Sequence, residues 1–525
     1  MKLNMWLIII SFFMAANPLY AQMKTDKPPR NLDHYINRVL QTFNVPGVSV
    51  AIVKDGKVIL AKGYGVKKLG SSEPVDAHTL FAIASNSKAF TTTALALLVE
   101  QGKLKWDDPV IKYLPWFRMS NDYVTSRITI RDLLVHHSGL GLGAGDLLWW
   151  PVTDYTRDQI VHHLRNVPLA TGFRQKFAYD NLLYQVAGEV ISKVSGETWE
   201  DFVAGHIFKP LGMNESIDKS EAIVHQKNVS TPHAKVNGRL QIVKPFIDNV
   251  TDPAGGIATN AVDMAKWMIV QLDSGRTAEG RQLFHPESTV QLWRMVTPID
   301  IPKYPKELVP AQMNFYGYGL GFFLSDYRGE KLVWHTGELR GYVSRVTLVP
   351  KLKLGIAVLT NQESEDAFNA ITYHLLDYYL RAPSYDWISA YKTLMNKRNE
   401  TVASSVKSSE ATRDSTAGPS LPLAEYAGTY HDAWYGNVTI SIVKGHLEIR
   451  FDHTPDLIGK LDHWQYDTFI ARWNDRELRA DAFVTFELNP DGTINQVRMK
   501  AASHATDFSY DFRDLLLKPL SVKGK

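Results

Sequence analysis

The sequence predicts an α+β protein in which an antiparallel sheet is flanked by helices, carries an inserted helical region, and is followed by a small antiparallel β-barrel. Two β-rich runs lie on either side of Asp55-Gly56, and three further strand-like runs lie between residues 332 and 360. Segments with helical spacing fill much of the chain between these two sets of strands. After residue 422 the pattern changes to short alternating runs. We therefore expect the early and late strands to join in one sheet.

Local signals predict the individual elements. Asp-Gly between two β-rich runs is a strong hairpin signal, because both residues tolerate positive φ. Residues 139–145 are rich in glycine, which predicts a flexible loop, and we expect this loop to lie near the functional site described below. The other expected elements are a meander with strands at 332–334, 343–349 and 355–360, helices over 31–43, 180–195, 261–272 and 367–379, and a glycine turn at 253–257.

Composition divides the 525-residue chain into four segments. From about residue 399 to 422 the chain is rich in Ser, Thr, Ala, Glu and Lys and has few apolar side chains to bury, which is typical of a linker. The segments we expect are a signal peptide over 1–21, a first globular domain over 28–385, the end of a helix with a flexible linker over 386–421, and a β-barrel domain over 422–525.

The first residues have the pattern of an export signal. Lys2 supplies a short positive end, and residues 6–13 form an apolar core too short for a comfortable membrane span. Ala21 before Gln22 offers a cleavage point. We expect an exported protein, periplasmic or secreted, with no membrane span once the signal is removed; an uncleaved N-terminal anchor is the alternative.

Charge and cysteine usage exclude several classes of protein. The formal net charge of +3 gives no nucleic-acid footprint. The absence of cysteine excludes a disulfide scaffold, a cysteine nucleophile and a cysteine-ligated metal. His136 and His137 have no acidic or histidine partners at ligand spacing, so we expect no metal and no other cofactor.

The stretch around Ser85 has the pattern of a serine nucleophile. A short apolar run ends at Ser85, and a helical segment that looks buried begins directly after it. Residues three apart share a helix face, so the Lys88 amine is expected beside the Ser85 hydroxyl. Free backbone N–H groups and the positive end of the helix dipole lie at the same place. The pattern therefore predicts a hydroxyl, an amine and oxyanion donors together.

Ser-x-x-Lys spacing alone is a weak signal. The alternative is that Ser85 is a plain N-cap residue and that Lys88 is a solvated helix residue. Context favours Ser85, because Ser404 lies in a polar stretch and Ser441 in an alternating run, neither of which offers a buried helix start. The same spacing recurs at Ser216/Lys219, Ser389/Lys392, Ser404/Lys407 and Ser441/Lys444.

Two later stretches supply candidate partners for Ser85. Tyr179 and Asn181 open a predicted helix, so the phenol and the amide lie on one side of a tight turn. Tyr179 is a candidate to act as the general base or to share a proton with Lys88, since a nearby ammonium favours a phenolate. Asn181 is a candidate ligand for a substrate carbonyl and for Lys88. The bland alternative for Tyr179 is a half-buried tyrosine bonded to a backbone carbonyl.

His335, Thr336 and Gly337 end one strand of the meander. The glycine allows a substrate to approach the strand edge closely. The next N–H group, that of Glu338, is a candidate to pair with the Ser85 N–H as the oxyanion hole. The alternative for His335 is a strand-end histidine without a catalytic role.

These three stretches, in this order, resemble the serine β-lactamase and penicillin-binding-protein family, in particular class C β-lactamases, D-aminopeptidases, alkaline D-peptidases and related esterases. The resemblance covers roughly residues 30 to 385, and the terminal domain is similar to the lipocalin-like domain of some members. It implies Ser85 as the nucleophile, Lys88 and Tyr179 as acid–base partners, and 335–337 as the strand-edge element. Supporting phrases are Pro46-Gly47-Val48-Ser49, Leu133-Leu134-Val135-His136-His137-Ser138-Gly139, Pro210-Leu211-Gly212-Met213 and Pro253-Ala254-Gly255-Gly256.

One departure separates this chain from many β-lactamases, which carry Lys where this chain has His335. A neutral imidazole attracts a substrate carboxylate less than an ammonium does. This lowers the expectation of β-lactam hydrolysis and suits a peptidase or an esterase.

We therefore expect a secreted serine hydrolase that forms an acyl-enzyme on Ser85 and cleaves an amide or ester, in a D-amino-acid-containing peptide or a small ester. The first alternative is a β-lactamase or a penicillin-sensitive DD-peptidase, and the second is a catalytically silent cell-wall peptide binder. The expected partner is a small-molecule or peptide substrate and not nucleic acid. Homo-oligomerisation through the C-terminal domain stays open.

Overall fold

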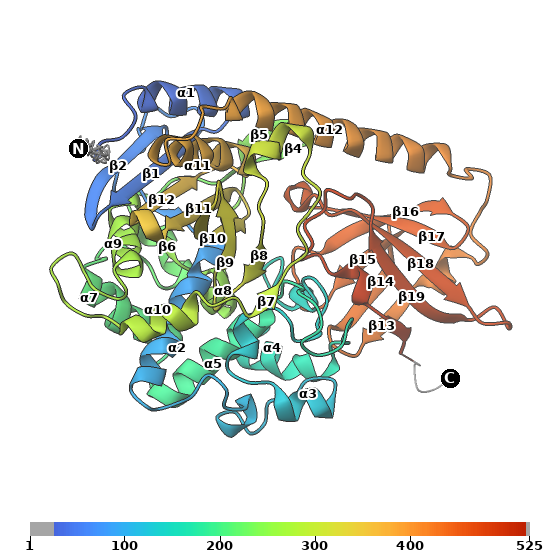
Figure 1. The fold of residues 1–525 in the computed structure, drawn as a ribbon. Helices are drawn as coiled ribbons and strands as arrows, with labels where there is room; N and C mark the ends of the chain where they lie inside the picture. Colours follow the sequence, from blue (N-terminus) through green and yellow to red (C-terminus); the bar gives the residue numbers. More distant parts are fainter. Residues whose placement is uncertain (1–25, 521–525) are drawn as a thin grey trace, which may run out of the picture.

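An eight-stranded antiparallel sheet organises the larger part of the chain (Figure 1). The computed structural model describes residues 26–520. The predicted hairpin and meander join in this sheet, because β1 pairs with β12 and places Val50 opposite Val358. The strand order is β2 (Lys57–Gly65), β1 (Gly47–Lys54), β12 (Leu354–Thr360), β11 (Tyr342–Val349), β10 (Glu330–Leu339), β9 (Phe323–Tyr327), β8 (Tyr316–Tyr318) and β7 (Thr297–Pro298).

Helices cover both faces of this sheet. Val48, Val50 and Ile52 of β1 share one apolar cluster with α1 (Leu32–Phe43) and α11 (Glu365–Tyr379). Ala51 and Val53, which point to the opposite face, belong to the cluster that contains α9 (Ala261–Leu272). Burial on both faces explains why β1 reads as a continuous apolar run, and each fully buried aliphatic side chain contributes about 1.5–3 kcal/mol to stability.

The hairpin turn has the conformation that its sequence predicts. Asp55 and Gly56 have φ of 50° and 75°, as a type I′ turn requires.

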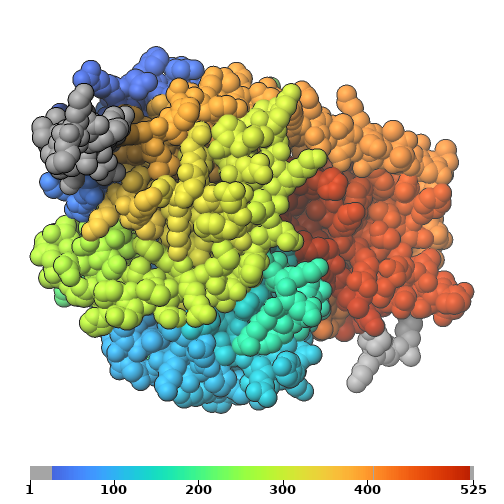
Figure 2. Space-filling view, viewed as in Figure 1, coloured from blue at the N-terminus to red at the C-terminus, as the bar shows by residue number. Residues whose placement is uncertain are grey.

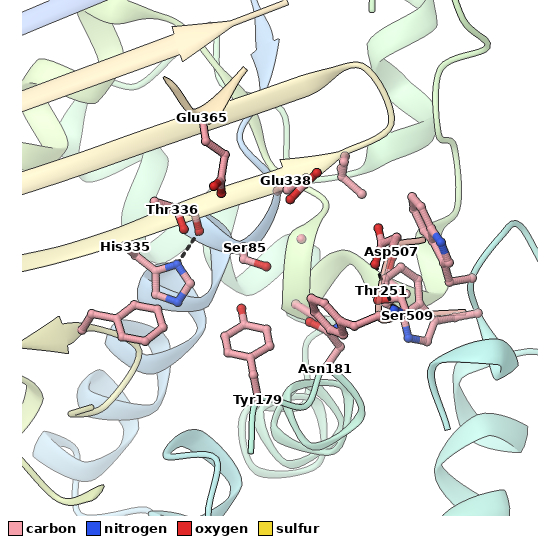
Figure 3. A pocket seen from close by; sticks show the side chains of 18 of the residues that line it. Ser85, Tyr179, Asn181, Thr251, His335, Thr336, Glu338, Glu365, Asp507 and Ser509 are labelled. Carbon is pink, nitrogen blue, oxygen red and sulfur yellow. Dashed lines mark hydrogen bonds between the residues drawn. The ribbon is translucent and has the colours of Figure 1, made fainter. Parts of the chain in front are cut away.

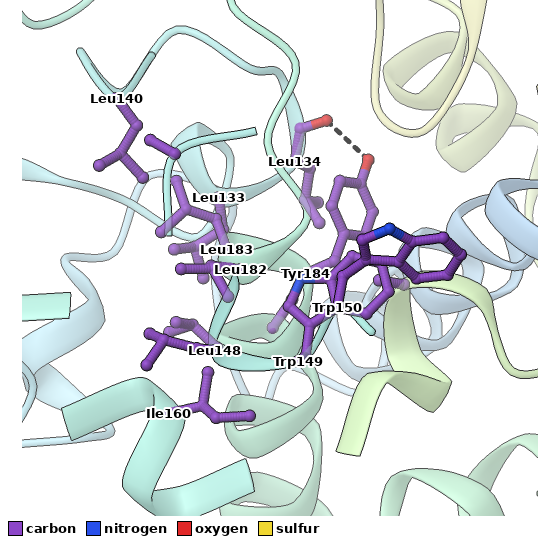
Figure 4. Close-up of a cluster of buried hydrophobic side chains, with 14 of the residues drawn as sticks. Leu133, Leu134, Leu140, Leu148, Trp149, Trp150, Ile160, Leu182, Leu183 and Tyr184 are labelled. Carbon is purple, nitrogen blue, oxygen red and sulfur yellow. Dashed lines mark hydrogen bonds between the residues drawn. The ribbon is translucent and has the colours of Figure 1, made fainter. Parts of the chain in front are cut away.

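The predicted helical insertion comes between β2 and β7 in the chain, and its apolar side chains belong to the cluster that also contains one face of the sheet (Figure 4). Leu133, Leu148 and Leu183 are fully buried there, and the Tyr184 hydroxyl donates to the Leu134 carbonyl at 2.8 Å. Residues 253–255 belong to the short helix α8 (Asp252–Gly255), so only 256–257 of the predicted glycine turn lie outside a helix. The insertion contains α2 (Ser87–Glu100), α3 (Asp122–Arg127), α4 (Arg157–His163), α5 (Leu182–Ser195), α6 (Trp199–Val203), α7 (Lys209–Leu211), α8 (Asp252–Gly255) and α10 (Pro286–Leu292), with the two-stranded pairs β3 (Phe81–Ala82) with β6 (Ala258–Thr259) and β4 (His233–Val236) with β5 (Arg239–Ile242).

The C-terminal domain is an antiparallel eight-stranded sheet that is nearly closed into a barrel, as predicted. A bridge between Val497 of β19 and Leu517, just before β20, brings the two ends of the sheet together. The strands are β13 (Gly428–Asp432), β14 (Gly436–Val443), β15 (His446–Phe451), β16 (Ile458–Gln465), β17 (Thr468–Trp473), β18 (Ala482–Leu488), β19 (Ile494–Ala501) and β20 (Lys518–Pro519).

The predicted flexible linker is wrong over most of its length. Residues Trp387–Ala411 form the 25-residue helix α12, which leaves only the residues up to Pro422 irregular before the barrel. Asp386 caps this helix by accepting from the Ser389 N–H. Ion pairs from Lys397 to Glu307 and from Arg398 to Asp366 attach its middle to the first domain. An apolar stripe at the start of α12 anchors it, since Trp387, Ile388 and Tyr391 belong to the cluster that contains α1 and α11. The Ser-, Thr-, Lys- and Glu-rich remainder continues this anchored helix into solvent.

The two domains are packed directly against each other (Figure 2). One apolar cluster runs from the helical insertion into the barrel without interruption. The Tyr155 hydroxyl donates to the Tyr435 carbonyl at 2.6 Å, and Arg479 donates two hydrogen bonds to Glu363. The barrel is thus fixed relative to the sheet by buried as well as polar contacts.

The predicted signal peptide, residues 1–21, lies outside the described residues. Within 26–520 no helix combines the length and apolar character that a membrane crossing requires.

Candidate active site

Ser85 lies on a tight turn that leads into α2. It occupies the middle of a 3₁₀ turn over Ala84–Asn86, directly before the first residue of the helix. Ala84 has a φ of 48°, a left-handed conformation that is unusual for a residue with a side chain. Ser344 of β11 holds the turn, since its hydroxyl donates to the Ile83 carbonyl and accepts from the Asn86 amide, each at 2.8 Å. The turn leaves the Ser85 hydroxyl at the edge of a cavity.

Lys88 lies beside Ser85, as the spacing predicts. Its side chain is fully buried, and Nζ lies 2.9 Å from Ser85 Oγ, 2.8 Å from Asn181 Oδ1 and 2.9 Å from the Ala254 carbonyl of α8. Burial lowers the pKa of the Lys88 ammonium to about 7, although Asp146 and Asp180 act in the opposite direction. A neutral amine keeps two N–H groups, which Asn181 and Ala254 accept. Its lone pair then faces the Ser85 hydroxyl and can take its proton.

Tyr179 stands at the entrance to α5 and points toward Ser85 (Figure 3). Its ring lies 5.0 Å from Lys88 Nζ. Burial raises the pKa of Tyr179 well above its usual value, so the predicted phenolate is wrong for the unliganded protein. The buried Tyr179 Oη has no hydrogen-bond partner among residues 26–520. An unpaired buried hydroxyl is costly, and Ser85 is the neighbouring side chain that opposes the rise in the pKa of Tyr179.

Asn181 is oriented by a carboxylate that sequence reasoning missed. Asn181 Nδ2 donates to Asp146 Oδ2 at 2.8 Å, which leaves Asn181 Oδ1 for Lys88. Burial raises the pKa of Asp146 to about 7, and hydrogen bonds from Trp149, Asn181 and Ser509 oppose this rise. Nothing in the local sequence around Asp146 distinguishes it from a solvated aspartate.

Residues 335–338 pass Ser85 along β10, inside the strand rather than at its end. A Cβ on Gly337 would lie 2.0 Å from the Ile83 carbonyl oxygen, so only glycine allows this strand to approach the Ser85 turn. Thr336 and Glu338 both line the cavity that contains Ser85. The predicted pairing of the Glu338 and Ser85 N–H groups as an oxyanion hole is compatible with this placement and stays a prediction.

His335 lines the same cavity but has no free ring nitrogen. Nε2 lies 2.8 Å from the Tyr318 hydroxyl, and Nδ1 bonds the Thr336 carbonyl. Burial, with Lys88 nearby, lowers the pKa of His335 to about 3, so the imidazole is neutral at ordinary pH. Since Nδ1 must donate to the carbonyl, Nε2 accepts from Tyr318. His335 thus supplies no cation for a substrate carboxylate.

The cavity next to Ser85 has a volume of about 280 Å³, and the C-terminal domain forms part of its wall. Asp507, Phe508 and Ser509 reach it from the segment that follows β19 (Figure 3). Glu338 is open to the cavity but surrounded by protein, and this enclosure together with Asp507 raises the pKa of its carboxyl well above its usual range. Aromatic side chains form a large part of the remaining wall: Trp149, Trp150, Phe177, Tyr316 and Phe323.

The glycine-rich loop 139–145 is the surface on which this C-terminal segment rests, and it is held rather than flexible. A Cβ on Gly143 would lie 2.7 Å from the Phe508 ring, and the Gly145 N–H donates to Asp511 Oδ2 at 2.8 Å. The glycines indicate that another segment packs closely against this backbone, but the sequence does not identify the C-terminal segment as that partner.

The beta-lactamase family model matches residues 32–379 of this chain. The chain belongs to the beta-lactamase family. A second model, described as a domain of unknown function (DUF3471), matches residues 412–519. Serine hydrolase activity is supported for this beta-lactamase-family chain by the family and by its relatives.

Relatives of the beta-lactamase-family chain include matches that span both domains. Unguisins hydrolase ungD' of Aspergillus campestris is 30% identical over 488 residues, which cover 88% of this chain and 87% of the relative. Protein flp of Staphylococcus aureus is 28% identical over 354 residues, covering 65% and 64%. The octameric penicillin-binding protein homologue from Pyrococcus abyssi has a TM-score of 0.57 at 22% identity and covers 93% of this chain and 99% of that chain, which shows a shared fold.

The predicted site residues of this beta-lactamase-family chain meet at one place, and His136 of the histidine pair packs directly against one of them. Ser85, Tyr179, Asn181, His335, Thr336 and Glu338 line one cavity, with Lys88 behind Ser85. His136 packs under Tyr179, and His137 bonds Asp132 at 2.7 Å. Residues 26–520 contain no group of three or more side chains arranged to hold a metal ion.

The pKa of Lys88 predicts the acid side of the activity profile. We expect kcat/KM to fall about tenfold per pH unit below about pH 7, because protonation removes the lone pair that accepts the Ser85 proton. The measurement is kcat/KM from about pH 5 to about pH 9. A fall that begins near the ordinary pKa of lysine, 10.5, would show that Lys88 is not held neutral.

Proposed function

We propose that this chain is an exported serine hydrolase that acylates Ser85 and cleaves an amide or ester, in a D-amino-acid-containing peptide or a small ester. The observation that carries the proposal is the fully buried Lys88 amine, 2.9 Å from Ser85 Oγ, with a pKa lowered to about 7. Lys88 takes the Ser85 proton during attack on the carbonyl, and Tyr179 passes a proton to the leaving group. Water then attacks the acyl-enzyme by the reverse route.

The cavity supports a small substrate or one end of a peptide. Its volume of about 280 Å³ lies at the lower limit of the usual size of ligand sites. The C-terminal segment with Phe508 limits its length, and the aromatic wall suits an apolar group beside the scissile bond. The relative from Aspergillus campestris is named for hydrolysis of unguisins, which agrees with a hydrolytic role.

The two alternatives are less well supported. A β-lactamase or DD-peptidase needs attraction for the substrate carboxylate, but His335 is neutral and supplies no cation for it. A silent binder has no need of a buried amine with a lowered pKa beside a serine, since that arrangement costs stability.

A substrate screen with covalent labelling tests the proposal. We expect a fluorophosphonate to label the wild-type protein at Ser85, and turnover to appear among D-aminoacyl amides or short-chain esters before nitrocefin. L-aminoacyl amides serve as matched controls for stereochemistry. Rapid nitrocefin hydrolysis would support the β-lactamase alternative, and a protein that is neither labelled nor active would support the binder.

Two further expectations concern export and self-association. Export through the N-terminal signal is tested by fractionation and by N-terminal sequencing of the mature protein. Self-association through the C-terminal domain stays a prediction, which light scattering on the full chain measures.

A further inference from the structure

The C-terminal domain contributes a side chain to the polar network behind Ser85. Ser509 is 5% exposed, and its Oγ donates to Asp146 Oδ2 at 2.8 Å, although 363 positions separate the two residues in the chain. The same carboxylate oxygen accepts from Asn181 Nδ2 at 2.8 Å. Trp149 Nε1 donates to the other oxygen at 2.9 Å. A continuous path of hydrogen bonds therefore runs from Ser509 through Asp146 and Asn181 to Lys88.

The ionised form of Asp146 fixes the direction of each hydrogen bond. Burial raises the pKa of Asp146 to about 7, and the Ser509 hydroxyl opposes that rise. An ionised carboxylate only accepts, so in this form Asp146 holds the Asn181 NH₂ group toward itself, as the structure has it. Asn181 Oδ1 is then available to accept from Lys88 Nζ at 2.8 Å. Ala254 accepts the second N–H of a neutral amine, and the lone pair is left for Ser85. If Asn181 turned over, an N–H group would face the amine, and the lone pair would be drawn away from the nucleophile.

We propose that Ser509 is a positioning residue, through which docking of the C-terminal domain holds Asp146 and Asn181 in the orientation that aims the Lys88 amine at Ser85. This inference rests on the proposed hydrolase function. The C-terminal domain therefore contributes to positioning the catalytic groups, in addition to lining the cavity.

The packing around Ser509 supports this role. Phe508 lies against Gly143, where a Cβ would come within 2.7 Å of the ring, and Asp511 accepts from the Gly145 N–H, one residue before Asp146. Ser509 and Asp146 are thus held by contacts on both sides of their hydrogen bond. Asp146 already accepts hydrogen bonds from Asn181 and Trp149. A residue that only filled space at position 509 would not need to donate a third.

The charged groups around Asp146 give the sign of a pH effect. The titratable groups that interact electrostatically with it include Lys88, Tyr179, Asp180 and Asp511. The Ser509 hydroxyl stabilises the ionised form of Asp146, and ionised Asp146 in turn raises the pKa of Lys88. Removing the hydroxyl therefore lowers the negative charge near Lys88, so the acid limb of the kcat/KM profile moves to lower pH.

Ser509→Ala, Ser509→Thr and the exposed control Ser441→Ala of the same domain test the proposal in the full chain. For Ser509→Ala we expect kcat/KM on its plateau to fall about tenfold and the acid limb to move down by about half a pH unit, with the melting temperature nearly unchanged. Ser509→Thr, which keeps the hydroxyl, should restore both values, and Ser441→Ala should match the wild type.

Three outcomes would overturn the inference: an unchanged profile for Ser509→Ala, a lower plateau with an unmoved acid limb, or a failure of threonine to rescue. If the alanine variant does not fold, Ser509→Cys carries the same prediction, because a thiol has similar size and is a weaker donor. A wild-type protein that is neither labelled at Ser85 nor active would defeat the proposed function itself, which separates the two failures.

Discussion

Replacing Ser85 with alanine is expected to lower kcat/KM by about 10⁴-fold or more and to abolish labelling by a fluorophosphonate. Both processes need the Ser85 oxygen as the atom that forms the new bond. The hydroxyl is half-buried and its neighbours are held by Ser344, so alanine should leave the fold unchanged. Turnover by steady-state kinetics and labelling by intact mass give the two readings.

Ser404→Ala is a matched control for this experiment, because Ser404 has the same Ser-x-x-Lys spacing but lies exposed on α12. It should behave as the wild type. Retention of labelling at another serine in the Ser85→Ala protein would remove Ser85 from the mechanism, whatever its geometry.

Replacing Lys88 with methionine is expected to slow acylation by about 10³–10⁴-fold. Methionine has nearly the length of lysine and suits a fully buried site, but it cannot accept the Ser85 proton. The variant leaves Asn181 Oδ1 and the Ala254 carbonyl without their donor, which we expect to cost about 1–3 kcal/mol of stability for each group. The rate of fluorophosphonate labelling measures acylation directly, and a thermal melt measures the stability.

Lys407→Met, on the exposed part of α12, controls for the general effect of losing a lysine. If Lys88→Met labelled at the wild-type rate, the base would have to be another group, and Tyr179 is the nearest candidate. The acid limb near pH 7 would then also have to persist in the variant.

Sequence periodicity was sufficient for most of the fold because local signals and long-range burial agree. The helix predicted over 261–272 is α9 residue for residue, and the hairpin turn at Asp55 has the conformation that Asp-Gly favours. Agreement failed at α12, where composition indicated a linker. The apolar stripe that anchors α12 lies in its first half, at Trp387, Ile388 and Tyr391. The predicted linker began at about residue 399, beyond this stripe, where polar composition does not distinguish a solvated helix from a linker.

The residues of the active site also fall into two groups, those that the local sequence predicts and those that it does not. Ser85 and Lys88 share one turn of chain, so their meeting is a local consequence of helix geometry. Asp146 and Ser509 carry no local signal, since their contact depends on how one domain docks on another across 363 positions. The phenolate expected for Tyr179 failed for a related reason, because the burial that raises its pKa is a property of the assembled cavity.

The rigid connection between the domains carries a constraint on insertions and deletions. Helix α12 has 25 residues, and at about 1.5 Å and about 100° per residue it spans roughly 37 Å. Arg413, two residues after its end, donates to the Trp464 carbonyl in the barrel at 2.7 Å. Inserting one residue into the exposed part of α12 would rotate Arg413 around the helix axis. Because Arg413 is bonded to the barrel, the barrel would be displaced, and Ser509 would lose its contact with Asp146. Indels in α12 should therefore be tolerated much less than substitutions at the same positions.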